Sequence, residues 1–339
     1  MKKIIGILLI AATLMSLTGC DKGRKRFRNL DANIKPEAVH IVRFDEALMD
    51  ITPAKAPAQI KDLTKQYPTE MTLWSNLLGY DSTSLQYLAP DWAMFLSDTL
   101  YSNTNKEVRR QYADISDIEE DLSKAYARLH IFYPQIVIPH IFFYISGFNS
   151  SIIADENTIG VGVDRYLGSD YWVYQNLYNV YNYQLYGMQR SCVAADIMST
   201  TLFQHFLFPS DESRLLDKML YYGRILYLLS VIFPDIKENE IIEYTPLQWR
   251  WCIDNERAAW GKMLDNKALF NTDSFDQNQY LYDAPFTSPI SPDSPGRMGT
   301  WFGYRIINSY MENNPDVTMQ ELMAEYDSQK ILEKSGYNP

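Results

Sequence analysis

The stretch "SPGRMGTWFGYRIINSYM" (residues 294–311) has the pattern of a long helix with one smooth face. Pro295 suits the first helical position, where its missing N–H costs nothing. Three glycines follow at helical spacing, at positions 296, 299 and 303. Because glycine has no Cβ, a neighbouring backbone can approach such a face closely. We therefore predict that another segment of main chain packs against these glycines.

Helix signals continue on both sides of this stretch. From Asp170 onward the chain is nearly all helical in pattern. The sequence "TPLQ" (residues 245–248) combines an N-cap threonine, a proline at the first helical position and a capping box. Thr318 with Glu321 caps one last helix, which Gly336 ends. The second half of the chain is therefore expected to be a helical mass.

The first half carries the strand signals. Runs typical of strands are an alternating segment at His40–Phe44, a β-branched and aromatic segment at 135–147, and two short strands around a turn within 151–168. Between them lies a helix that Ser116 and Glu119 begin as a capping box. The sequence thus predicts an α+β fold, predominantly helical, with a small N-terminal sheet and a helical C-terminal half.

The chain begins with two lysines, an apolar run from Ile4 to Leu17, and "LTGC" at 17–20. The run is too short for a comfortable membrane span. A small residue before a cysteine resembles the bacterial lipoprotein signal, in which the peptide is cut before the cysteine and the thiol receives a diacylglycerol. An ordinary signal peptide, or a membrane anchor with a chance cysteine, is the alternative. The resemblance implies a signal peptide over 1–19, acyl modification of Cys20, a basic tether over 20–36 and a single domain over 37–339.

Acidic side chains outnumber basic ones, and the chain has a net charge of -11. Loss of the two lysines in the signal peptide would leave about -13, which makes the chain a poor binder of nucleic acid. We expect it to meet a membrane through its lipid and to have envelope proteins as partners. The basic segment 21–29 is unlike the acidic start of many surface lipoproteins of the Bacteroidota, which favours a periplasm-facing location. In that compartment Cys192 and Cys252 can pair or stay free.

Metal and nucleotide motifs are not found in the sequence. The "GVG" at 160–162 lacks the third glycine of a dinucleotide fingerprint. The four histidines are widely spaced, so an H-E-x-x-H zinc helix does not occur. His205 lies in the apolar run "TTLFQHFLFP" (residues 200–209), where we favour a core histidine over the remnant of a lost metal site. We expect no metal, and no cofactor beyond the diacylglycerol and acyl groups on Cys20.

Two charged residues are candidates for chemistry or binding. Glu256 lies among three tryptophans in "WRWCIDNERAAW" (residues 249–260), and a carboxylate held against aromatic walls can act as an acid. The alternative, which we favour, is a helix whose carboxylates face outward or pair with arginine. Arg297 opposes the dipole of the helix that it begins, so it needs a carboxylate partner or a bound anion. We favour a partner within the protein.

Several long segments carry a resemblance to a known family. They are "KMLYYGRILYLLSVIFPD", "YTPLQWRWCIDNERAAW" and "DAPFTSPISPDSPGRMGTWFGYRIINSYM", joined by the earlier "VRFDEAL" and "DRYLG". In this order, after a lipoprotein signal, they resemble the gliding-motility lipoprotein family of the Bacteroidota, the GldB-like proteins. The resemblance implies an envelope lipoprotein linked to gliding or to the associated secretion system.

That family is also distantly similar to predicted zinc-dependent proteases, which implies a zincin-like fold. If His205 takes the place of the second zinc histidine, Thr201 and Leu202 stand where the first histidine and the glutamate belong. The downstream glutamate position then falls on Tyr222. Hydrolysis catalysed by zinc needs three protein ligands and a base. Because these residues are replaced, the resemblance implies a pseudoenzyme.

We therefore predict a non-catalytic binding or assembly protein of the envelope. The alternative is a cryptic hydrolase that acts through Glu256, Asp196 or His205 on a periplasmic peptide or glycan. The residues predicted to line a former active-site cleft are Asp196, His205, Tyr222, Glu256 and Arg297.

Overall fold

The computed structural model describes residues 27, 30, 34–81, 84–177, 180–209 and 213–339. These residues form two compact units. The sheet unit consists of residues 34–207 and 237–249, and the helical unit contains residues 208–236 and 250–339. Each unit therefore combines segments that are far apart in the sequence, and the expectation of a single domain stays a prediction.

The sheet unit is built around four strands, β1 (Ile41–Val42), β2 (His140–Tyr144), β3 (Ile152–Asp155) and β4 (Thr158–Gly162). Their order in the sheet is β1-β2-β4-β3. Strands β1 and β4 both run parallel to β2, whereas β3 pairs with β4 in the antiparallel sense. All five residues of β4 are buried, as expected for a strand covered on both faces.

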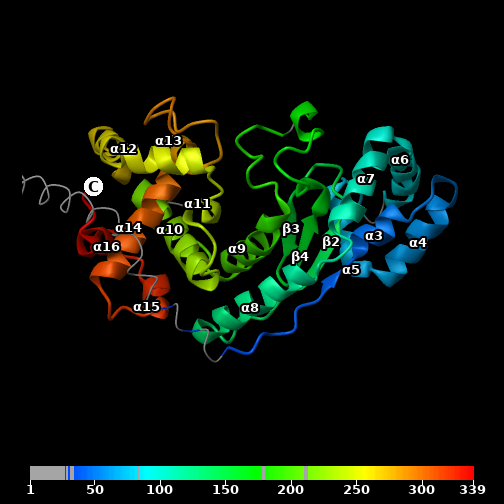
Figure 1. The fold of residues 1–339 in the computed structure, drawn as a ribbon, viewed down its shortest axis with the longest axis horizontal. Helices are drawn as coiled ribbons and strands as arrows, with labels where there is room; N and C mark the ends of the chain where they lie inside the picture. The colour runs from blue at the N-terminus through cyan, green and yellow to red at the C-terminus, as the bar shows by residue number, and fades with distance from the viewer. Residues whose placement is uncertain (1–26, 28–29, 31–33, 82–83, 178–179, 210–212) are drawn as a thin grey trace, which may run out of the picture. The chain divides into compact units, whose positions relative to one another are not determined.

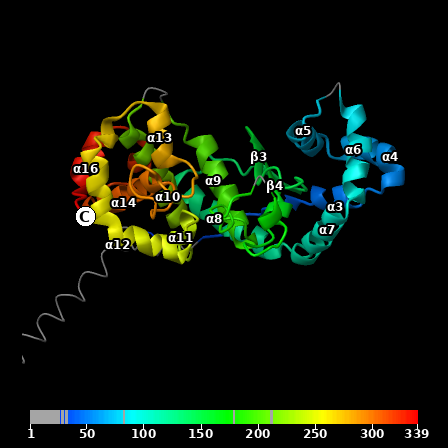
Figure 2. The same ribbon diagram turned by 90° about the horizontal axis from the view of Figure 1, so that it is seen from above.

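The helices of the sheet unit are α3 (Phe44–Met49), α4 (Ala56–Gln66), α5 (Pro68–Leu77), α6 (Leu85–Ser97), α7 (Thr99–Gln111), α8 (Ser116–Phe132), α9 (Val193–His205) and α11 (Glu238–Ile241). Helix α9 packs against β3 and β4, and α8 lies alongside α9 (Figure 1). Helix α4 contacts α5 and α6, and α6 in turn contacts α7 (Figure 2). Helix α9 therefore packs on β3 and β4, and α5 from the group that follows α3 also contacts β3.

The helical unit contains α10 (Leu215–Ile232), α13 (Ser274–Leu281), α14 (Met298–Asn313), α15 (Met319–Ala324), α16 (Ser328–Ser335) and most of α12 (Pro246–Asp265). Helix α14 is central, because it contacts α10, α13 and α16 (Figure 2). Trp301, Phe302 and Tyr304 are buried on it. These large rings supply much of the apolar surface that this unit removes from water.

The predicted glycine face of this helix is confirmed. A Cβ on Gly303 would fall on the carbonyl oxygen of Met219, and one on Gly299 would lie 3.0 Å from the carbonyl oxygen of Tyr280. Gly223 of α10 faces Gly303 in return, because a Cβ there would lie 2.8 Å from the amide nitrogen of Tyr304. The backbones of α10 and α14 therefore cross in direct contact at Gly223 and Gly303.

The start of this helix differs from the prediction. Helix α14 begins at Met298, not at Pro295, and Arg297 has a left-handed backbone with φ of 58°. The carbonyl of Pro295 accepts the amide of Thr287 at 3.0 Å, and the Thr287 hydroxyl accepts the amide of Met298 at 3.1 Å. The chain before α14 is thus fixed by a neighbouring loop, which proline preference alone does not reveal.

Other helix ends were predicted with mixed success. The capping box at the start of α12 is confirmed, since the Thr245 hydroxyl accepts the amide of Gln248 at 3.2 Å and the Gln248 side chain accepts the amide of Thr245 at 2.9 Å. The capping box at Ser116 is wrong. Asp114 accepts the Ser116 amide at 2.9 Å, and Glu119 accepts the amide of Ile41 in β1 instead.

The predicted last helix is two helices. Thr318 and Glu321 form the expected capping box, but α15 then ends at Ala324. A second N-cap follows, in which the Asp327 side chain accepts the amide of Lys330 at 3.0 Å. Gly336, with φ of 60°, ends α16 as predicted.

The fold class is confirmed as predominantly helical with a small mixed sheet. The signal peptide over 1–19, the acylated Cys20 and most of the tether over 20–36 lie outside the described residues. Within the described residues, no helix combines the length and the apolar character needed to cross a membrane.

Candidate functional site

The five residues predicted to share a cleft belong to both units. Asp196 and His205 lie on α9 in the sheet unit, whereas Tyr222, Glu256 and Arg297 lie in the helical unit. They therefore form two sets, one in each unit.

Glu256 is held by two partners within the helical unit. Its carboxylate accepts two hydrogen bonds from the Arg305 guanidinium, at 2.9 and 3.2 Å, and a third from the Tyr337 hydroxyl at 2.6 Å. The side chains of Arg305 and Glu256 are only 16% and 13% exposed, so the ion pair is weakly screened. The Arg305 guanidinium also lies 5.7 Å from the centre of the Trp301 ring. The predicted pairing with arginine is confirmed.

Arg297 and Tyr222 also contact other side chains of the helical unit. Arg297 forms an ion pair with Asp283 at 2.9 Å, which confirms a partner within the chain. Tyr222 is half-buried on α10 and its ring packs against that of Tyr221, 5.4 Å away between centres. Burial and the neighbouring Tyr282 raise the pKa of the Tyr222 hydroxyl.

The prediction of a core histidine at position 205 is wrong. His205 is exposed and is the last residue of α9, where the helix gives way to an irregular segment. Its apolar neighbours in sequence do not enclose it, because a helix turns successive residues by about 100° onto different faces. Thr201, one turn earlier, is the buried residue, and its hydroxyl lies 2.8 Å from that of Tyr126.

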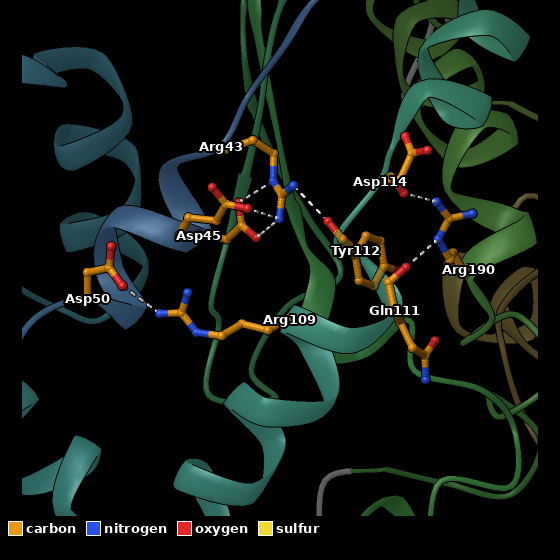
Figure 3. A network of polar contacts seen from close by, with 9 residues as sticks. Arg43, Asp45, Asp50, Arg109, Gln111, Tyr112, Asp114 and Arg190 are labelled. Atoms are coloured by element: carbon orange, nitrogen blue, oxygen red, sulfur yellow. Dashed lines mark hydrogen bonds and ion pairs between the residues drawn. The ribbon is translucent and has the colours of Figure 1, made fainter.

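A polar network surrounds "VRFDEAL" and is shown in Figure 3. Arg43 donates to both carboxylate oxygens of the fully buried Asp45, at 3.0 and 2.8 Å, and to the carbonyl of Tyr112 at 2.7 Å. Arg109 on α7 reaches Asp50 at 2.7 Å. The network fastens the end of α7 to the segment around α3.

A second arginine fastens the other side of the same loop. Arg190 donates to the carbonyls of Gln111 and Asp114, at 3.1 and 2.8 Å (Figure 3). It also pairs with the carboxylate of Asp117 at 2.7 Å. Its guanidinium also lies 5.4 Å from the centre of the Tyr112 ring. The hydrogen bond from Arg190 lowers the pKa of the Asp117 carboxyl. The loop between α7 and α8 is therefore held by side chains from two distant segments.

The segment "DRYLG" supports a strained loop at the end of β2. Asp164 is fully buried and accepts the amides of Ser146 and Phe148, each at 2.8 Å, and the Ser146 hydroxyl at 3.0 Å. Gly147 and Phe148 both have left-handed backbones, with φ of 64° and 63°. That conformation is costly for phenylalanine, and it persists because Asp164 and its neighbour Arg165 bind the loop. Burial raises the pKa of Asp164, although the three donors favour its ionised form.

The loop forms one wall of a pocket of about 300 Å³. The pocket lies at the carboxyl end of β2, which has the parallel strands β1 and β4 on its two sides. The carboxyl ends of parallel strands are a common place for binding sites. Aromatic rings from α6, α7 and the segment before α6 form most of the remaining wall, namely Tyr80, Trp92, Phe95 and Tyr101. Sequence reasoning missed this pocket, because its residues come from distant segments and share no local motif.

The rings in this pocket are packed in a row. Trp92 stacks on Phe95 with 4.4 Å between ring centres and an angle of 15° between planes. Phe95 lies 3.6 Å from Tyr101, which stacks in turn on Phe148 of the strained loop at 5.8 Å. Trp92 is 3% exposed and Trp74 packs edge-on behind it. The row thus connects the loop to α6 and α7 through direct ring contacts.

Comparison with protein-family models gives a match over residues 27–339, to the family described as gliding motility protein GldB. This chain belongs to the GldB family. A search of curated proteins and one of solved structures gave no match. The family match covers all of the described residues and confirms the predicted resemblance, and with it a lipoprotein family associated with gliding motility. Likeness to zinc-dependent proteases and a zincin-like fold stay predictions.

The motifs that carry the GldB resemblance thus have structural roles in this chain. "VRFDEAL" supplies the network of Figure 3, and "DRYLG" supplies Asp164 and Arg165. Tyr166 of the same motif donates to Asp196 on α9 at 2.6 Å. Three of the five predicted residues, Asp196, Glu256 and Arg297, therefore bind other side chains of the protein.

Among the described residues, no group of three or more histidine, cysteine, aspartate or glutamate side chains is arranged to hold a metal ion. Both described cysteines are free thiols, and pairing of Cys192 with Cys252 stays a prediction, because they belong to different units. Cys252 is buried with its sulfur 3.4 Å from that of Met298.

We expect Cys192 to react slowly with alkylating agents in the folded protein. Burial, together with the carboxylates of Asp196 and Glu243, raises its pKa to about 12, against an ordinary value of 9.0. The reactive thiolate is then ~1,000-fold scarcer at neutral pH than in the unfolded chain. Iodoacetamide labelling, followed peptide by peptide with mass spectrometry, should show a rate that rises about tenfold per pH unit from pH 7 to 10. A native rate that levels off below pH 9 would contradict this environment.

Proposed function

We propose that this GldB-family chain is a lipid-anchored, periplasm-facing envelope protein that acts as a non-catalytic binding or assembly component linked to gliding or protein secretion machinery. The family match supports the link to gliding and the lipid anchor. The lipoprotein signal that ends at Cys20 supports an anchor made of diacylglycerol and acyl chains. The acidic composition supports protein partners over nucleic acid.

The non-catalytic part of the proposal rests on the hydrogen bonds that Glu256 accepts from Arg305 and Tyr337. A general acid must change its protonation state during the reaction and must reach the substrate. Glu256 instead meets a guanidinium and a phenol within the protein, and it is 13% exposed. Protonating it would break an ion pair that links α12 to α14.

The alternative function is a hydrolase that acts on a periplasmic peptide or glycan. One cluster in the sheet unit favours it, because the carboxylates of Asp196 and Glu243 add to the effect of burial in raising the pKa of both Cys192 and Tyr166. Two neighbouring carboxylates are a common arrangement for acid–base work. Asp196, however, already accepts the Tyr166 hydroxyl at 2.6 Å.

We expect the variants Asp196→Asn and His205→Ala to retain the function of the chain in cells. The asparagine side chain in the first variant keeps an oxygen that can accept the Tyr166 hydroxyl, and His205 is exposed at a helix end, so both variants should fold. The measurement is the gliding or secretion output of a deletion strain that carries each variant at wild-type abundance. Cys20→Ser, which removes the acylated thiol, is the control for loss of anchoring.

A loss of function as large as that of the deletion, at normal abundance, would favour the hydrolase. Removal of a general acid or base typically lowers a rate by about 10²- to 10⁴-fold, which such an assay registers.

A further inference from the structure

The pocket at the end of β2 carries a negative charge at its rim. Asp91 on α6 is exposed there, and the Tyr80 hydroxyl donates a hydrogen bond to one of its carboxylate oxygens. Among the described residues that line the pocket, none is a lysine, arginine or histidine.

Aromatic rings complete the wall around that carboxylate. Phe95 and Tyr101 are each partly exposed, and both line the pocket together with Tyr80. Both rings also stack on their neighbours in the row. What they offer a ligand is therefore apolar surface, against which the methylene stem of a long cationic side chain can pack. A carboxylate beside several rings is therefore complementary to an organic cation and repels carboxylates and phosphates, the more so in a chain of net charge -11.

A strained backbone segment also shapes the pocket before any ligand binds. Its far wall is the loop in which Gly147 and Phe148 hold left-handed backbones, fixed by the buried Asp164. Side chain and backbone polar groups of that loop, including the exposed Asn149, line the same pocket as Asp91. Strain that the surrounding structure maintains is typical of binding sites, because it removes the cost of ordering the site when a ligand arrives.

We propose that this pocket binds a basic side chain, an arginine or a lysine, that is presented by a protein partner of the chain. The inference rests on the proposed binding function and names the chemistry of the partner. A volume of about 300 Å³ suits one long side chain with its flanking backbone. The ammonium or guanidinium group meets Asp91, its methylene stem lies on Phe95 and Tyr101, and the neighbouring peptide groups reach Asn149.

The test is isothermal titration calorimetry on the full chain in detergent micelles. The probes are four capped tripeptides with alanine on both sides of arginine, lysine, leucine or glutamate, and tetramethylammonium chloride as a small cation. We expect the arginine and lysine peptides to bind at least tenfold more tightly than the leucine and glutamate peptides. Asp91→Asn should weaken this binding at least tenfold, and Asp62→Asn, which removes an exposed charge from α4 outside the pocket, should change it less than twofold.

Three outcomes would overturn the inference. They are equal binding of the basic and leucine peptides, unchanged binding to Asp91→Asn, and binding of tetramethylammonium without binding of either basic peptide. Because Asp91 is exposed, its variant should keep the wild-type melting temperature, so a loss of binding is not a loss of folding. Each of these failures leaves the proposed envelope function standing, since that function is tested separately through Asp196 and His205.

Discussion

Replacing Gly303 with alanine is expected to destabilise the helical unit by more than about 3 kcal/mol, or to prevent its folding. The added methyl group falls on the carbonyl oxygen of Met219, so it meets backbone that has no alternative rotamer. Helices α10 and α14 must then move apart along a crossing where Gly223 and Gly303 now touch. Buried rings on both sides of that crossing would lose contact, which adds a packing cost.

Gly261 on α12 provides the matched control. A Cβ there meets nothing within 4 Å, and alanine has a higher helix propensity than glycine. Gly261→Ala should therefore raise the stability by about 0.5–1 kcal/mol. The measurement is guanidinium unfolding followed by circular dichroism, with hydrogen exchange at the amides of α10 and α14. Similar unfolding midpoints for the two variants would contradict the backbone contact in the structure.

Replacing Asp164 with asparagine is expected to cost about 2–4 kcal/mol and to loosen the loop at 146–149. All three of its partners donate hydrogen bonds, two from amides and one from the Ser146 hydroxyl. Asparagine offers one accepting oxygen and one NH₂ group, so at least one buried amide would face another donor. Phe148 would then lose a contact that offsets its left-handed backbone.

The control for this variant is Asp62→Asn, which makes the same chemical change at an exposed position and should alter stability by less than about 0.5 kcal/mol. Thermal unfolding gives the stability, and hydrogen exchange at Ser146 and Phe148 reports on the loop. Exchange at these two amides that is as slow as in the wild type would show that Asp164 does not hold the loop.

Local signals in the sequence predicted those parts of the fold that depend on neighbouring residues. The capping box of Thr245 and Gln248 and the two strands around the turn at 155–157 fall in this class. The prediction at Ser116 failed because Glu119, the residue that should complete the box, is taken by the amide of Ile41 in β1. A local sequence pattern does not show that a residue distant in the sequence will take the same hydrogen-bond acceptor.

The candidate site divides in the same way. That Glu256 and Arg297 would each pair with an oppositely charged side chain of the protein could be predicted, because a buried charge, or one that opposes a helix dipole, needs a partner. The exposure of His205 could not, because an apolar run does not show where its helix ends. The pocket at Asp91 was missed, since a row of rings spread over α6, α7 and a strained loop forms only when the chain has folded.

The most direct test of a chain that works by binding, and not by hydrolysis, compares two variants in the deletion strain at equal abundance. One is the double variant Asp196→Asn with His205→Ala, and the other is Asp91→Asn. Gliding or secretion output is the measurement. We predict wild-type gliding or secretion output from the double variant and a marked loss of this output from Asp91→Asn. Loss of output from the double variant, with full output from Asp91→Asn, would contradict it.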